Sequence, residues 1–209
     1  RNPIMIKVAL PKGRIAQEAL KIFEDFLQTS LDFEDRKLIL KKKDFEFMLV
    51  RSQDVPVYVE RGAADIGVVG LDVLEEKQSR LVRLLDLGFG KCKVAIGSPN
   101  DYVLDFSKPK LKIATKMENI TKAYFAKKAI SVDIIKLYGS IELAPLVGMA
   151  DAIVDLVETG STLRQNNLKI DEVIMEVSAY LVANSNSFYA QKREILEIQK
   201  YFKNFIKKD

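Results

Sequence analysis

The 209-residue sequence contains no histidine and no tryptophan, and it has a single cysteine, Cys92. Without histidine the chain cannot build a Ser-His-Asp or Cys-His catalytic site, and most zinc sites are excluded too. One cysteine excludes an internal disulfide and favours a reducing compartment. Cys92 lies in an apolar strand pattern, so we interpret it as a core residue. Any chemistry must therefore depend on carboxylates, lysines, arginines and backbone amides, with Mg²⁺ as the metal that suits them.

Long apolar runs and a strong net charge are also missing. No apolar stretch approaches the ~18 residues of a membrane-spanning helix, and Ile4–Leu10 is too short for a signal peptide. Arg1–Pro3 precede Met5, which we take as the natural start. The net charge is only +4, and its tightest run, Lys41–Lys43, lies between two segments typical of an exposed hairpin. We expect a cytoplasmic protein that binds neither membrane nor nucleic acid.

Short apolar runs alternate with helical patterns along the chain, which predicts an α/β fold with mixed, mainly parallel sheets. The turn residues Ser98–Asp101 separate two such cycles, and a long β pattern over 174–183 brings the chain back. We therefore expect two lobes with a cleft between them, lobe I from residues 1–98 and 182–209 and lobe II from residues 99–181. The expected strands are 4–10, 37–40, 46–50, 65–70, 91–97, 112–115, 133–137, 152–155 and 174–183, and the expected helices are 15–27, 54–62, 73–77, 121–129, 140–147, 160–166 and 188–205.

The stretch from Ala152 to Leu163 combines an apolar strand, an acidic residue and a small polar turn before a helix. Gly160 permits close approach of a ligand, Thr159 is a suitable helix cap, and the helix start carries partial positive charge, so the stretch can cradle a phosphate. Asp151 and Asp155 lie just upstream, where they can hold ribose hydroxyls or Mg²⁺. A turn of this kind is also a common simple cap, so both interpretations stay open.

Two further strand ends carry candidate residues. Lys12-Gly13-Arg14 brings two cations to a helix start, which favours anion binding but also fits a surface turn. Gly70 and Asp72 form a thin loop beside another strand end, where glycine also serves close helix–strand packing. Arg36 and Arg51 belong to the hairpin region, and considered alone they are typical exposed residues.

Three separate motifs, in order along nearly the whole chain, resemble those of the ATP phosphoribosyltransferase family. They are Ala9–Arg14, the pattern Arg51…Asp54-Val55-Pro56…Gly62…Asp65–Asp72, and the string Tyr138–Leu163. The resemblance implies a fold similar to type II periplasmic binding proteins, with the active site in the cleft. It implies transfer of the 5-phosphoribosyl group of PRPP to N1 of the ATP adenine, with release of pyrophosphate, as the first step of histidine biosynthesis. It also implies Mg²⁺ as cofactor, which we expect on the substrate phosphates.

The resemblance further implies partners. The long form of the family carries an additional C-terminal regulatory domain, whereas this chain resembles the short form. The short form implies a hetero-oligomer with a regulatory subunit resembling histidyl-tRNA synthetase, and we also expect a homodimer of catalytic chains.

Residue roles follow from the resemblance as expectations. No strong general base is needed, because adenine N1 already carries a lone pair, and catalysis can come from positioning and charge neutralisation. The expected PRPP-binding residues are Thr159, Gly160, Ser161 and Thr162 for the 5′-phosphate and Asp151 and Asp155 for the ribose diol, with Glu142 assisting. The expected catalytic residues are Arg36 and Arg51, which neutralise pyrophosphate, and the expected ATP-binding residues are Lys12, Gly13, Arg14, Gly70 and Asp72.

Two other functions stay open. A solute receptor or sensor domain can have the same two-lobed fold, but it has no need for a phosphate turn with paired carboxylates. A different phosphoribosyltransferase is disfavoured by Leu156, because the purine-salvage type carries a second acidic residue at that place.

Overall fold

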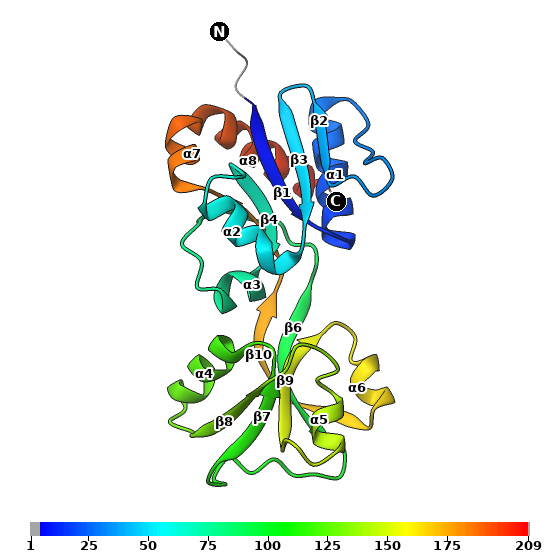
Figure 1. The fold of residues 1–209 in the computed structure, drawn as a ribbon, viewed down its shortest axis with the longest axis vertical. Helices are drawn as coiled ribbons and strands as arrows, with labels where there is room; N and C mark the ends of the chain where they lie inside the picture. Colours follow the sequence, from blue (N-terminus) through cyan, green and yellow to red (C-terminus); the bar gives the residue numbers. More distant parts are fainter. Residues whose placement is uncertain (1–4, 209) are drawn as a thin grey trace. The chain divides into compact units, whose positions relative to one another are not determined.

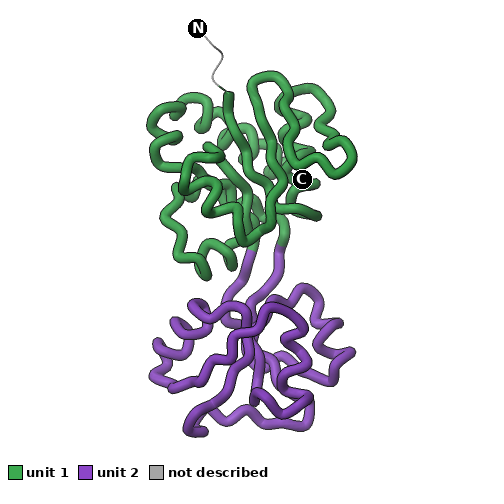
Figure 2. The backbone as a smooth tube through the Cα atoms, in the orientation of Figure 1, with its two compact units in different colours: residues 1–90, 178–209 green, residues 91–177 purple. Residues whose placement is uncertain are grey.

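In a computed structural model that describes residues 5–208, the chain forms two compact α/β units (Figures 1 and 2). Unit 1 contains the chain up to Gly90 and again from Ser178, and unit 2 contains Lys91–Val177. The chain passes between the units at 90/91 and 177/178. The boundaries expected from the sequence, at 98/99 and 181/182, lie slightly later in the chain. The difference arises because β6 and β10 pair from Cys92↔Val177 onward, so that all of β6 belongs to the sheet of unit 2. Residues 1–4, including the segment ahead of Met5, lie outside the described residues.

The sheet of unit 1 has six strands in the order β2-β3-β1-β4-β11-β5. The central trio β3-β1-β4 is parallel, and the remaining neighbours are antiparallel. β2 and β3 form the hairpin expected around Lys41–Lys43, and Lys43 Nζ donates to the Leu27 carbonyl at the end of α1, where a cation is favourable. The strands are β1 (Ile6–Pro11), β2 (Ile39–Lys42), β3 (Phe45–Val50), β4 (Ile66–Gly70), β5 (Val82–Asp86) and β11 (Ala179–Ala183).

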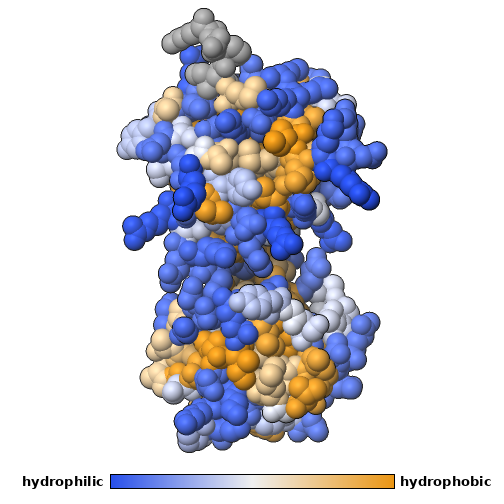
Figure 3. Space-filling view, viewed as in Figure 1, coloured by the Kyte–Doolittle hydropathy of each residue, from blue (hydrophilic) through white to orange (hydrophobic). Residues whose placement is uncertain are grey.

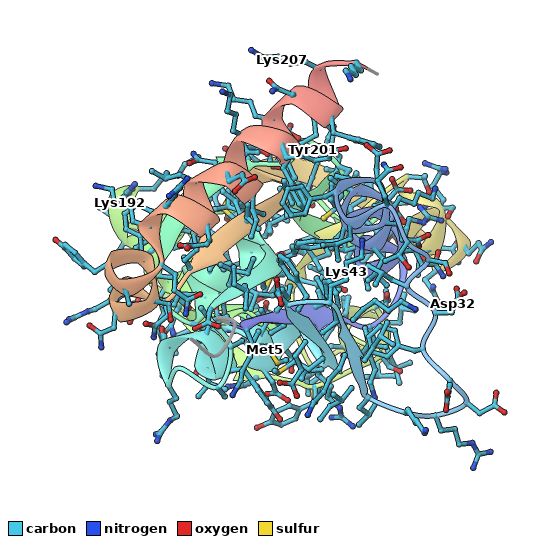
Figure 4. The ribbon with its side chains drawn as sticks, turned by 90° about the horizontal axis from the view of Figure 1, so that it is seen from above. Met5, Asp32, Lys43, Lys192, Tyr201 and Lys207 are labelled. Atoms are coloured by element: carbon cyan, nitrogen blue, oxygen red, sulfur yellow. The ribbon has the colours of Figure 1, made fainter. Side chains whose placement is uncertain are left out.

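Helices cover both faces of this sheet. On one face, Phe23 of α1 packs edge-on against Phe47 and Phe202, with ring centroids 5.0 and 4.9 Å apart. In Figure 4, Tyr201 on α8 points towards α1, where its hydroxyl bonds the Asp25 carboxylate. On the other face, α2 and α3 pack against residues of β1, β4 and β11. The helical elements are α1 (Arg14–Leu27), η1 (Ser52–Asp54), α2 (Val55–Glu60), α3 (Leu71–Glu76), α7 (Ser185–Ala190) and α8 (Lys192–Lys207).

The sheet of unit 2 has five strands in the order β10-β6-β9-β7-β8. The trio β9-β7-β8 is parallel, while β6 is antiparallel to both of its neighbours. One face packs against α5 and α6 and the other carries α4 (Figure 1). The strands are β6 (Cys92–Pro99), β7 (Leu111–Thr115), β8 (Val132–Lys136), β9 (Ala152–Val157) and β10 (Leu168–Val177), and the helices are α4 (Glu118–Lys127), α5 (Leu143–Leu146) and α6 (Ser161–Gln165).

The sheets are mixed, but they are not mainly parallel as the sequence predicted. Four of the nine neighbouring strand pairs are parallel, because the hairpin and the strands that link the units add antiparallel neighbours. Within residues 5–208 no helix has the length and apolar character needed to cross a membrane. Hydrophilic side chains cover most of the face seen in Figure 3, consistent with the dispersed charge of the sequence.

Candidate functional site

The three parallel strands of unit 2 end at one edge of their sheet. Thr115 at the end of β7 is level with Lys136 on β8 and Val154 on β9. The residues that follow these strand ends are Lys116, the segment 138–142 and the turn 158–160. Because ligands of open α/β sheets bind at the carboxyl ends of the strands, this edge is the candidate site of unit 2.

The turn after β9 has the geometry of a ligand cradle, with one correction to the expected cap. Gly160, rather than Thr159, occupies the cap position of α6, with φ at +80°, a conformation that favours glycine. Thr159 Oγ1 accepts a long bond from the Ser161 N–H at 3.4 Å and donates to the Ser161 hydroxyl at 3.1 Å. The side chains of Thr159, Ser161 and Thr162 are all exposed, so their hydroxyl groups line an accessible turn.

Arg164 also belongs to this turn, although we did not select it from the sequence. Its Nη1 donates to the Thr159 carbonyl at 3.2 Å, and a Cβ added to Gly160 would lie 2.9 Å from the same nitrogen. The spacing of four residues between Gly160 and Arg164 is a signal for this contact, because residues four apart share one helix face.

Asp155, Glu142 and Lys116 interact at the same edge. Burial raises the pKa of Asp155, the Leu156 N–H bonded to its Oδ1 at 2.8 Å and the Lys116 charge act against it, and the Glu142 charge adds to the rise. Glu142 occupies the cap position before α5. The structure thus brings two of the predicted acidic residues within electrostatic reach of each other. Lys116 was missed, although its place directly after a strand end marks it.

Asp151 does not join them, because it lies before the first residue of β9. Its Oδ2 accepts the Lys112 N–H at 2.9 Å, its own N–H donates to the Lys112 carbonyl at 2.9 Å, and its Oδ1 pairs with Lys108 Nζ at 2.7 Å. Four extended residues separate the Cα atoms of Asp151 and Asp155 by about 13 Å. Both oxygens of the Asp151 carboxylate are bonded to Lys108 and Lys112, at the far end of β9 from the turn, so the structure does not bring the two acids together as the expected diol-binding pair.

Unit 1 contains the same arrangement at the start of β4. Asp65 Oδ2 accepts the Lys7 N–H at 2.9 Å, and the Asp65 N–H donates to the Lys7 carbonyl at 2.8 Å. In each unit, an aspartate directly before a strand therefore bonds the backbone of the neighbouring parallel strand. This repetition gives Asp151 a structural role in positioning β9.

The parallel strands of unit 1 also end at one edge. Pro11 at the end of β1 is level with Val50 at the end of β3, and the Lys12 N–H donates to the Val50 carbonyl at 3.0 Å. Arg51 follows β3, and Gly70 ends β4, which is parallel to β1, with Asp72 two residues later in α3. Gly13 occupies the cap position before α1 with φ at +113°, where a side chain would be strained. The register thus brings Lys12, Gly13, Arg14, Arg51, Gly70 and Asp72 to one edge.

Arg36 reaches this edge from the hairpin. The Leu49 N–H donates to the Leu38 carbonyl at 2.9 Å, and Arg51 and Arg36 each lie two residues beyond this bond in the sequence, just outside β3 and β2. Arg36 is exposed and has φ at +54°, in the turn before β2. Together with Lys12 and Arg14, the two arginines give the edge a concentration of positive charge that suits a polyphosphate anion.

Two other observations concern a cavity elsewhere in unit 2 and possible metal ligands. A cavity of about 330 Å³ in unit 2 is lined by residues 100–104, Phe106, Lys169, Asp171 and Glu172. It lies beyond the end of β6, which is antiparallel to β9, and so at the opposite edge from Thr159. Among residues 5–208, no group of three or more acidic or cysteine side chains is placed to hold a metal ion.

Known proteins are similar to this chain over nearly its whole length. The family model described as HisG, ATP phosphoribosyltransferase, matches residues 51–204. The ATP phosphoribosyltransferase of Wolinella succinogenes is 68% identical over 198 residues, which cover 95% of this chain and 96% of that protein. The corresponding protein of Campylobacter concisus is 64% identical over 204 residues, covering 98% of this chain and 100% of that one.

Solved structures agree with these matches. A chain of the ATP phosphoribosyl transferase (HisG:HisZ) complex from Thermotoga maritima is 32% identical with a TM-score of 0.86, covering 98% of this chain and 100% of that chain. The periplasmic aliphatic sulphonate binding protein SsuA of Escherichia coli is only 11% identical, with a TM-score of 0.65 over 98% of this chain and 73% of that one. The latter confirms the periplasmic-binding-protein-like fold alone. The matches to sequence and structure together show that the chain belongs to the ATP phosphoribosyltransferase family, whose reaction is the first step of histidine biosynthesis.

Proposed function

We propose that the two strand edges divide the work of this reaction. The edge of unit 2 binds PRPP through its 5′-phosphate and ribose, and the edge of unit 1 binds ATP and the pyrophosphate group. The observation that carries the proposal is the register of the parallel strands, which gathers the hydroxyl-rich turn and Asp155 at one edge and the cations at the other.

The turn after β9 is suited to the 5′-phosphate. Hydroxyls of the exposed Thr159, Ser161 and Thr162 can donate to phosphate oxygens, and Gly160 supplies the positive φ that shapes the turn. Ser161→Ala should therefore raise the KM for PRPP while the KM for ATP stays near the wild-type value. An unchanged KM for PRPP would remove this residue from the phosphate site.

Asp155 is suited to the ribose. Its Oδ1 is held by the Leu156 N–H at 2.8 Å, which restricts the orientation of the carboxylate, and within residues 5–208 its Oδ2 has no such backbone bond to compete with a ribose hydroxyl. A carboxylate accepts two O–H donors, and Lys116 offsets its charge in a partly buried place. Glu142 assists from the adjacent loop. Asp151 is left out of this proposal because its carboxylate is bonded to Lys108 and Lys112.

The reaction transfers the 5-phosphoribosyl group to N1 of the ATP adenine and releases pyrophosphate. Adenine N1 attacks with its own lone pair, so the chain needs no strong general base. The barrier lies in breaking the bond to pyrophosphate, and fixed cations lower it by neutralising the developing negative charge. We assign that role to Arg36 and Arg51, while Lys12, Gly13, Arg14, Gly70 and Asp72 line the ATP side.

We assign Mg²⁺ to the phosphate groups of the substrates. The described residues offer no three-ligand cluster, so they do not fit a resident ion, and we derive no step through one. Polyphosphates commonly carry Mg²⁺ into enzyme sites that supply few protein ligands. Calorimetry of PRPP binding with and without Mg²⁺ tests this assignment. Binding of the metal alone with high affinity would contradict it.

The partner proposal rests on the Thermotoga relative, whose chain is part of a HisG:HisZ complex and is matched over its full length. We propose that this chain is likewise a short-form catalytic subunit, which forms a homodimer and binds a HisZ-like regulatory subunit in the cytoplasm. Light scattering after size-exclusion chromatography, with and without that subunit, gives the oligomeric state. A chain that stays monomeric with the subunit present would contradict the proposal.

The activity itself is tested by the ultraviolet absorbance of the N1-substituted adenine product. The assay contains ATP, PRPP, Mg²⁺ and a pyrophosphatase, and it is run with and without the regulatory subunit. Product formation supports the proposal. PRPP binding without product in either mixture would instead favour a binding protein.

A further inference from the structure

Arg164 holds a cation against the turn after β9. Its Nη1 lies 3.2 Å from the Thr159 carbonyl oxygen, and only the missing side chain of Gly160 leaves room for the guanidinium. Gly160 also needs its positive φ to form the turn. One glycine therefore serves both the shape of the turn and the place of the arginine.

Most of the donor capacity of Arg164 remains for a ligand. A guanidinium has five N–H donors, and the bond to Thr159 uses one of them. The side chain is exposed, so an incoming anion can reach it. Residues 91–177 contain eleven lysines but only this one arginine. An arginine differs from a lysine in its planar fork, which matches two oxygens of a phosphate at once.

We propose that Arg164 is a further PRPP-binding residue, which donates to the 5′-phosphate oxygens while Nη1 stays on the Thr159 carbonyl. This inference rests on the proposed function, because it takes the turn as the 5′-phosphate site. Thr159, Ser161 and Thr162 supply neutral donors, and Arg164 supplies the positive charge that a phosphate dianion requires. The turn then distinguishes a phosphorylated ribose from a free one.

The test compares Arg164→Gln with Arg164→Lys. Glutamine loses the charge but keeps a polar side chain with N–H donors, whereas lysine keeps the charge and loses the fork. Lys122→Gln is the matched control, because it removes one exposed positive charge from α4 of the same unit. Each variant is titrated with ribose 5-phosphate, and the KM for PRPP and for ATP is measured at constant ionic strength.

We expect Arg164→Gln to weaken ribose 5-phosphate binding and raise the KM for PRPP by about tenfold or more. Arg164→Lys should recover part of this loss, and Lys122→Gln should match the wild type. The KM for ATP and the melting temperature should not change in any of the three. A merely structural role would leave Arg164→Gln close to the wild type or would lower its melting temperature together with both affinities.

Different results would overturn the role of Arg164 and the phosphate site itself. Normal binding of ribose 5-phosphate by Arg164→Gln, while Ser161→Ala weakens it, overturns the role of Arg164 and leaves the phosphate turn in place. Failure of the wild-type chain to bind ribose 5-phosphate, with an unchanged KM for PRPP in Ser161→Ala, overturns both.

Discussion

Asp151 and Asp155 lie four residues apart along one strand segment, and their pKa values are shifted in opposite directions. For Asp151, burial raises the pKa, but the hydrogen bonds from Lys108 and from the Lys112 N–H outweigh it, so the net pKa is lowered. For Asp155, burial raises the pKa and is not outweighed. The fold thus stabilises the charged form of Asp151, whereas burial destabilises the charged form of Asp155. Shifts of the second kind are frequent at binding sites.

Asp151→Asn should lower stability without altering substrate affinity. The carboxyl pKa is lower in the folded chain than the ordinary 3.8, so its contribution is present above 3.8 and is lost as the pH falls through the folded value. We expect a loss of about 1 kcal/mol at pH 7, because Lys108 is partly exposed. Urea unfolding at pH 7 measures it, and the difference from the wild type should persist as long as the pH stays above 3.8 and shrink only at lower pH.

Lys108→Gln is the matched partner in this measurement. Because both changes remove the same ion pair, the double variant should lose less stability than the two single losses added together. Full additivity would show that the pair contributes nothing. A large rise in the KM for PRPP in Asp151→Asn would return Asp151 to the substrate site.

Asp155→Asn should have the opposite effect on stability and a large effect on binding. The pKa of Asp155 is higher in the folded chain than the ordinary 3.8. As the pH rises above 3.8, the carboxyl group therefore ionises in the unfolded chain before it ionises in the folded one. The free energy of unfolding falls over this range, until the pH exceeds the pKa of the folded chain. Removing the charge should therefore raise the melting temperature at pH 7. PRPP affinity should fall about tenfold or more, since a ribose hydroxyl loses a charged acceptor. A lower melting temperature with normal affinity would contradict both expectations.

Most elements were predictable from the sequence because the central strands of the parallel trios are rich in apolar residues between turns. β1 and β4 are buried along nearly their whole length, and the charged or glycine-containing turns after them mark their ends. Most residues at the two candidate edges were also predictable, because they lie at or just after the end of an expected strand. The position of Arg36 could not be predicted in this way, because it depends on the pairing of β2 with β3.

Other features depend on tertiary pairing. β5 is a half-buried edge strand, Val82–Asp86, whose mixture of charged and apolar residues gives no clear period. The expected strand 174–183 is divided at Ser178 into β10 and β11, which belong to different sheets, and β propensity does not specify the partner strand. Asp151 shows the same limit, because an acid beside a strand does not indicate which neighbour it bonds.

Arg51→Gln should lower kcat far more than it alters the fold. The backbone carbonyl of Arg51 accepts the N–H groups of Asp54 and Val55, and this structural role does not depend on the side chain. Loss of one group that neutralises the leaving charge should reduce kcat about 100-fold. Arg61→Gln is the control, because Arg61 is an exposed arginine at the end of α2. Near-normal turnover in Arg51→Gln would remove it from the mechanism.

Gly67→Ala tests the contact that positions β4, and hence the start of α3 after Gly70. A Cβ at this position would lie 2.9 Å from Val59 Cγ2 and 3.1 Å from the Ala9 carbonyl, so the packing of α2 on the sheet must shift. We expect a loss of about 1 to 3 kcal/mol in the free energy of unfolding. Gly139→Ala is the control, since an added Cβ there meets nothing within 4 Å.

A second substitution separates local crowding from a general intolerance of side chains in β4. Val59→Ala removes the methyl groups that lie closest to the new Cβ, although it leaves a small cavity of its own. The double variant should therefore recover part of the stability that Gly67→Ala loses, as a favourable coupling in a double-mutant cycle. If the two losses simply add, the crowding must come from the other two contacts of the new Cβ, the Ala9 carbonyl and Val55 Cγ1, both at 3.1 Å, and not from Val59.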